Sequence, residues 1–185
     1  MAPERMKTLE KWQGKAYFYR EMKKKLYIET SVWNQLVHTD RPDWKHVAER
    51  FFRTCERGLY ELYVSIILMD EIELAQAAVR DKLLKRIQKL SPEVLEYDKE
   101  AKDLTALYQE AEIIKSRKSN VIADLAQVAI AATNGIKHIV SFNCKHLVKD
   151  RSIDGFNGVN IRNGYDTLIE ITTPERFIDL PEEAE

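Results

Sequence analysis

Cysteine is scarce in this chain of 185 residues: only Cys55 and Cys144 occur, far apart and outside any Cys-x-x-Cys pair. This argues against a disulfide framework and against a thiolate zinc site, and a reducing compartment fits best. No apolar run approaches the length that a membrane-spanning helix needs. Charged residues occupy the N-terminal region where a signal peptide would have its hydrophobic segment. We therefore expect a cytoplasmic protein with no membrane partner.

An excess of positive charge is also missing. The 29 basic and 30 acidic residues give a net charge of -1, whereas a small nucleic-acid-binding domain is usually basic. Any polyanionic partner must therefore be met by local patches. The content of 32% charged and 44% hydrophobic residues is typical of a globular protein, and the length suits one domain.

The order of apolar segments predicts one compact α/β domain at 25–178, preceded by an N-terminal extension of unassigned role at 1–24 and followed by an acidic tail at 179–185. Strands alternate with helices, which favours a mostly parallel sheet covered by helices on both faces. Strands are expected at 26–28, 60–66, 94–95, 137–142, 155–161 and 168–171, and helices at 32–37, 42–57, 67–77, 79–90, 98–115, 121–132, 144–150 and 173–178.

The first strand is followed directly by an acidic residue, Glu29, and then by Thr30 and Ser31. Both hydroxyl residues are good helix N-caps. Glu29 is therefore expected at the carboxyl end of a strand, where ligands bind in open α/β sheets. Taken alone, an ordinary solvated loop residue explains this carboxylate more simply.

Two further acids, Glu71 and Asp124, fall on the apolar stripes of their helices. An ionised carboxylate removed from water costs several kcal/mol unless it is paired or bound to a metal. If both helices begin at the strand ends, these acids converge on Glu29, and Asn143 joins them from the end of a later strand. Such hard oxygen ligands suit Mg²⁺ or Mn²⁺. A cap or a salt-bridge partner is the plainer explanation for either acid.

Four segments in this order resemble the PIN domain family, including its toxin-type ribonucleases from toxin-antitoxin pairs. They are Tyr27-Ile-Glu-Thr-Ser-Val-Trp-Asn34, Ser65 through Glu71-Ile72, Asp124-Leu-Ala-Gln-Val-Ala-Ile-Ala131 and Val140-Ser-Phe-Asn-Cys-Lys-His-Leu147. The resemblance covers about Leu26 to Phe177. It implies a three-layer α/β/α fold and metal-dependent hydrolysis of RNA by an endoribonuclease. It also implies an antitoxin partner protein and a homodimer.

The resemblance places the catalytic and metal-binding positions on Glu29, Glu71, Asp124 and Asn143, with Thr30 or Ser31 as the supporting hydroxyl. The first acid of the family is usually aspartate, and the fourth is often aspartate. Glu29 and Asn143 therefore depart from the pattern, and both changes should weaken divalent-ion binding. They favour an alternative, a weakly active or inactive PIN-like module that binds nucleic acid or regulates.

Basic residues flank the acidic positions on both sides. They are Lys115, Arg117 and Lys118 before Asp124, and Lys145, His146, Lys149 and Arg151 after Asn143. We predict that they contact the RNA backbone without reading its sequence; a solvated face is an equally good explanation. A doubly wound phosphoryl-transfer domain is a third hypothesis, but it would need two neighbouring acids after the first strand, and these are not present.

Overall fold

The centre of the molecule is a five-stranded parallel sheet. The computed structural model describes residues 23–115, 119–166 and 168–179. The strands are β1 (Lys24–Ile28), β2 (Tyr60–Ser65), β3 (Glu93–Leu95), β4 (His138–Val140) and β5 (Glu170–Thr172), in the order β3-β2-β1-β4-β5. Every neighbouring pair is parallel. The predicted α/β class is confirmed.

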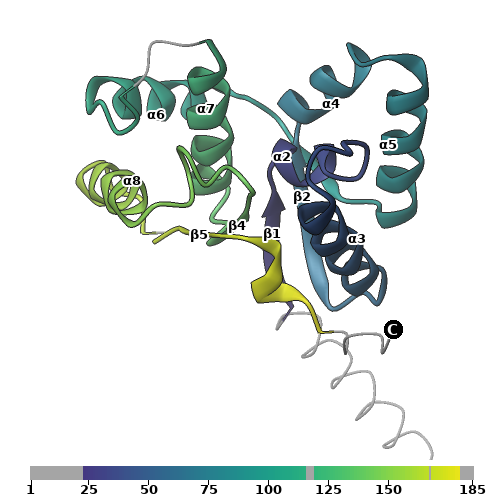
Figure 1. Ribbon diagram of the computed structural model, residues 1–185. Helices are drawn as coiled ribbons and strands as arrows, with labels where there is room; N and C mark the ends of the chain where they lie inside the picture. Colours follow the sequence, from purple (N-terminus) through teal and green to yellow (C-terminus); the bar gives the residue numbers. More distant parts are fainter. Residues whose placement is uncertain (1–22, 116–118, 167, 180–185) are drawn as a thin grey trace, which may run out of the picture.

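Helices cover both faces of the sheet and give it three layers (Figure 1). On one side lie α2 (Thr30–Asn34), α3 (Pro42–Glu56), α4 (Ile66–Glu73) and α5 (Ala77–Leu90), and on the other α6 (Lys99–Glu110), α7 (Ser119–Thr133) and α8 (Asp150–Arg162). The short 3₁₀ helix η1 (Pro174–Phe177) follows β5. The predicted three-layer α/β/α architecture is therefore confirmed.

The central strand β1 sends alternate side chains into two separate cores, as the period of a strand requires. Leu26 and Ile28 pack with Trp33 and the aromatic residues of α3, whereas Tyr27 packs with the residues of α6, α7 and α8. All three strand residues are fully buried. Burial of both faces of β1 fixes the position of the residue that follows it, Glu29.

Two of the predicted elements are wrong. The expected strand at 155–161 is part of helix α8, and the expected helix at 144–150 is a series of turns that precedes it. Gly155 and Gly158 weaken the helical signal of this segment. Phe156 and Val159 are nevertheless buried in the core shared with α6 and α7, and this packing overrides the local preference.

The N-terminal end of α2 differs from the prediction. The N-cap residue of α2 is Glu29, and Thr30 and Ser31 form its first turn, so the prediction that they cap it is wrong.

Residues 1–22 and 180–185 lie outside the described residues, and the predicted boundaries of the extension and the acidic tail stay predictions. In the described part of the chain, no helix has the length and apolar character needed to cross a membrane.

Candidate functional site

The candidate site lies at the point where the strand order of the sheet reverses. β1 and β4 are neighbours, but β1 leads on to β2 on one side and β4 to β5 on the other. In open α/β sheets this arrangement leaves a crevice at the carboxyl ends of the two strands, where ligands bind. Glu29 follows β1 and Asn143 lies three residues after the end of β4. The prediction that these two residues reach the same edge of the sheet is confirmed.

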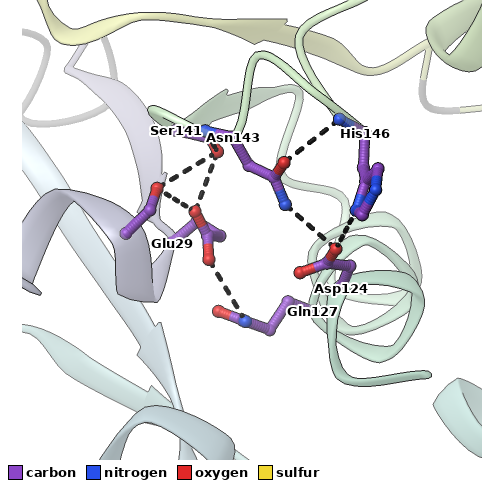
Figure 2. A network of polar contacts seen from close by, with 7 residues as sticks. Glu29, Asp124, Gln127, Ser141, Asn143 and His146 are labelled. Carbon is purple, nitrogen blue, oxygen red and sulfur yellow. Dashed lines mark hydrogen bonds and ion pairs between the residues drawn. The ribbon is translucent and has the colours of Figure 1, made fainter. Parts of the chain in front are cut away.

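Glu29 is buried, with 3% of its surface exposed, and two hydroxyl groups hold it. Its Oε2 accepts hydrogen bonds from the Ser31 hydroxyl and, at 2.8 Å, from the Ser141 hydroxyl. Its backbone N–H donates to the carbonyl of Val140 at 3.0 Å, which extends the pairing of β1 with β4. The Ser31 Oγ also accepts from the N–H of Phe142 at 2.8 Å. These bonds fix the carboxylate in one orientation (Figure 2).

Gln127 of α7 is a site residue that the sequence analysis missed. Its Oε1 accepts hydrogen bonds from the N–H of Thr30 at 3.3 Å, from the Thr30 hydroxyl at 3.2 Å and from the Tyr27 hydroxyl at 3.4 Å. Its Nε2 lies 3.5 Å from Oε1 of Glu29. Gln127 is three residues after Asp124, so both project from the same face of α7. The signal in the sequence was a glutamine one helical turn after Asp124, in a segment that is otherwise apolar.

Among the described residues, the hydrogen-bond partners of the Asp124 carboxylate contact one of its two oxygens. Its Oδ2 accepts a hydrogen bond of 2.9 Å from Nδ2 of Asn143 and lies 3.1 Å from Nδ1 of His146. Its side chain is 13% exposed. The other carboxylate oxygen points toward Glu29 (Figure 2). Asp124 is therefore oriented by the segment after β4 and leaves one oxygen for a ligand.

The orientation of the Asn143 amide bears on its predicted role as a metal ligand. Oδ1 of Asn143 accepts from the backbone N–H of His146 at 3.1 Å. Because a backbone N–H can only donate, this bond turns the NH₂ group toward Asp124. The amide would have to turn before its oxygen could reach a cation beside Asp124.

Burial raises the pKa values of all three candidate acids, and the charge of Asp124 adds to this effect on Glu29 and Glu71. The pKa of Glu29 is raised by burial, an effect that the Ser31 and Ser141 hydroxyls reduce and the charge of Asp124 increases. The pKa of Asp124 is also raised by burial, against the opposing effects of His146 and Asn143. The pKa of Glu71 is raised by partial burial of its carboxyl, lowered by the Thr30 hydroxyl and raised by Asp124. The carboxylate of Asp124 therefore acts on both glutamates.

Glu71 is the most solvent-accessible of the three. Its neighbours Leu68 and Ile72 on α4 are buried, whereas Glu71 as a whole residue is exposed. The prediction that it lies on the buried stripe of its helix is wrong. Only its carboxyl end, which Thr30 and Asp124 influence, belongs to the site.

The residues present suit a weakly held divalent cation. Within residues 23–115, 119–166 and 168–179, no three His, Cys, Asp or Glu side chains form a group that could hold a metal ion by themselves. Mg²⁺, however, commonly binds through one or two carboxylates together with waters and substrate phosphates. Glu29 and Asp124 are such a pair, and neither forms an ion pair with a lysine or arginine of the described residues. Their donor chemistry therefore fits Mg²⁺ or Mn²⁺.

The predicted RNA-binding residues fall into three groups. Lys115, Lys145, Lys149 and Arg151 are exposed. His146 is partly buried and contacts Asp124, so it belongs to the carboxylate site. Arg117 and Lys118 lie outside the described residues.

The two cysteines differ sharply in their surroundings. Cys144 follows Asn143 directly and is exposed, whereas Cys55 on α3 is buried, and burial raises the pKa of the Cys55 thiol to about 12. Both are free thiols.

Comparison of the chain with models of known protein families gave no match, and comparisons with curated proteins and with solved structures gave none either. The similarity to the PIN domain therefore rests on the four sequence segments alone.

Proposed function

We propose that this protein is a metal-dependent ribonuclease that hydrolyses RNA phosphodiester bonds. The observation that supports it best is that Glu29 and Asp124 lie together where the strand order of the sheet reverses, close enough for the charge of Asp124 to raise the pKa of Glu29. Both carboxylates are largely withdrawn from water, and no lysine or arginine of the described chain forms an ion pair with them. Carboxylates placed in this way are stabilised by a cation.

Each carboxylate has its own positioning groups. Ser31 and Ser141 orient Glu29, and Asn143 and His146 orient Asp124. Mg²⁺ or Mn²⁺ would be held by Glu29 and Asp124, with Glu71 at the edge of the site. When bound, such an ion lowers the pKa of a water ligand and offsets the charge of the phosphate.

The RNA substrate is proposed from the resemblance and from the charges around the site. Lys145, Lys149 and Arg151 are exposed on the segment that follows Asn143. Cations placed there would contact phosphates and position a strand without reading its bases. The antitoxin partner and the homodimer stay predictions of the resemblance.

The proposal is tested by incubating end-labelled single-stranded RNA with the full chain in Mg²⁺, in Mn²⁺ and in EDTA. We expect cleavage only with a divalent ion, and a loss of at least 100-fold in rate for Asp124→Asn, because the isosteric amide removes the negative charge. Asp154→Asn is the matched control, since Asp154 is exposed on α8. Equal cleavage by wild type and Asp124→Asn would show that another site or a contaminant is responsible.

One observation favours a second candidate, a PIN-like module that binds nucleic acid without cleaving it. Oε2 of Glu29 already accepts two hydrogen bonds, and Oδ2 of Asp124 accepts one from Asn143 and contacts His146. Burial also raises the pKa of Glu29, which favours its neutral form. RNA binding with no cleavage in either metal would favour this candidate.

A further inference from the structure

A basic groove lies between α3 and α5, at the far end of α2 from Glu29. It encloses a cavity of about 290 Å³. The lining residues are Leu36, Glu49, Lys82, Lys85, Arg86 and Lys89. Four of these six side chains are cationic, although the whole chain carries a net charge of -1. The groove is therefore a local concentration of positive charge.

The sequence of α5 produces this concentration. Lys82, Lys85, Arg86 and Lys89 are spaced by three and four residues, so they occupy one face of the helix. Leu83 and Ile87 on the opposite side are buried in the core. The cationic face lies beside α3, whose Glu56 contacts two of its side chains.

Acidic neighbours neutralise only part of this charge. Glu56 of α3 accepts from both Arg86 and Lys89, the latter at 2.8 Å. Lys82 donates to the carbonyl of Leu36 at 2.7 Å, and a carbonyl does not cancel its charge. Lys85 is exposed and forms no ion pair with any other described residue. Glu49 is the second carboxylate at the groove, so four cationic side chains lie near two carboxylates, Glu49 and Glu56.

We infer that this groove binds the phosphate backbone of single-stranded RNA as a second contact surface, outside the proposed cleavage site. Leu36 lies two residues after the end of α2, a helix about 8 Å long at a rise of 1.5 Å per residue. Lys82 and Lys89 are separated by about 10 Å along α5 by the same rise. A row of cations of this length suits the evenly spaced phosphates of an RNA strand that also contacts the proposed cleavage site. This inference deepens the proposed function and rests on it for the identity of the polymer.

The test measures binding without cleavage. Anisotropy of a fluorescein-labelled 12-nucleotide oligouridylate is followed in EDTA with the full chain, in both the wild-type and the Asp124→Asn background. We expect Lys85→Glu to weaken binding at least fivefold. Lys85→Gln should reduce the slope of log affinity against log salt by about 0.7, the value for one phosphate contact on a single strand. Lys102→Glu is the matched control, since Lys102 is exposed on α6, on the other side of the sheet.

Several outcomes would overturn the inference. The first is unchanged RNA affinity of Lys85→Glu when circular dichroism shows that the variant is folded. The second is an equal loss of RNA affinity in Lys102→Glu. The third is a wild-type protein that binds a labelled 12-residue polyglutamate peptide and does not bind the RNA. Absence of cleavage together with Lys85-dependent RNA binding would contradict the ribonuclease alone. Metal-dependent cleavage together with RNA binding that the Lys85 substitutions do not change would contradict only the proposal that the groove binds RNA.

Discussion

Nδ2 of Asn143 donates a hydrogen bond of 2.9 Å to Oδ2 of Asp124. The segment after β4 thus presents a neutral donor to the acid on α7, at the position where the resemblance leads one to expect a further acid. A donor at this position stabilises ionised Asp124 without a cation. If the proposed cation binds, the hydrogen bond between these two residues sets how much of the charge of Asp124 is stabilised without it.

Asn143→Asp should make the protein dependent on a divalent ion. A second carboxylate against Asp124 replaces an attraction with a repulsion, and we expect the free energy of unfolding in EDTA to fall by about 1–3 kcal/mol. Mn²⁺ should then raise the melting temperature of this variant more than that of wild type. Thermal melts with and without Mn²⁺ check this, with Asn143→Ala as the variant that loses the bond but gains no charge. If Mn²⁺ changes neither melting temperature, no cation binds there.

Glu29→Gln should stabilise the metal-free protein at neutral pH. Because burial raises the pKa of Glu29 in the folded state, ionising it opposes folding, and its contribution to stability is retained at low pH and lost as pH rises through the folded pKa. We expect the variant to have a larger free energy of unfolding than wild type at pH 8, because a glutamine at this position carries no charge that opposes folding. The difference in free energy of unfolding between the variant and wild type should become smaller as the pH falls toward about 4.3, the ordinary pKa of glutamate.

Urea unfolding at pH 8 and pH 5, in EDTA, measures this difference. Glu73→Gln is the control, since Glu73 is exposed on α4. Asp124 also has a raised pKa, so wild type retains some pH dependence, and only the difference between variant and wild type reports on Glu29. A variant less stable than wild type at pH 8 would contradict the prediction.

Gln127→Ala should destabilise the fold and loosen the site. The substitution leaves the Tyr27 hydroxyl and the Thr30 N–H, both buried, without the acceptor that they share. We expect the free energy of unfolding to fall by about 1–3 kcal/mol. Chemical denaturation checks this against Gln109→Ala, a change at an exposed position of α6. Equal stability of the two variants would show that the Gln127 bonds contribute nothing net.

Asp98→Ala tests a feature of the fold remote from the site. Oδ1 of Asp98 accepts from the N–H of Ala101 at 2.9 Å and caps α6. Its loss should lower the free energy of unfolding by about 1 kcal/mol and leave RNA binding and cleavage unchanged. A drop in activity without a drop in stability would argue against a purely structural role.

The sequence predicted the parts of this structure that depend on local pattern. An apolar triplet followed by Glu29 is enough to identify a buried strand that delivers an acid, and the apolar periodicity of α3, α5 and α7 marks these helices within a few residues. The prediction of a strand around Gly155 and Gly158 is wrong because glycine weakens the helical signal. The helix is stabilised by the packing of Phe156 in the core, which is a tertiary contact.

The hydrogen-bond partners in the site could not be predicted in the same way. Ser141 bonds to Glu29 from 112 residues away, and Gln127 from 98 residues away. The Ser141 contact exists because Ile28 pairs with Val140 in the register of β1 and β4, and the Gln127 contact because α7 packs against the face of β1 that carries Tyr27. No local pattern in the sequence reveals either arrangement.

The contrast between the two thiols gives the native chain a built-in attachment point. A maleimide dye should react at exposed Cys144 and spare Cys55, whose thiol is shielded and remains protonated at neutral pH. The fluorophore would then sit beside Asn143, so titrations with manganese or with oligonucleotides could be followed by emission without engineering any residue.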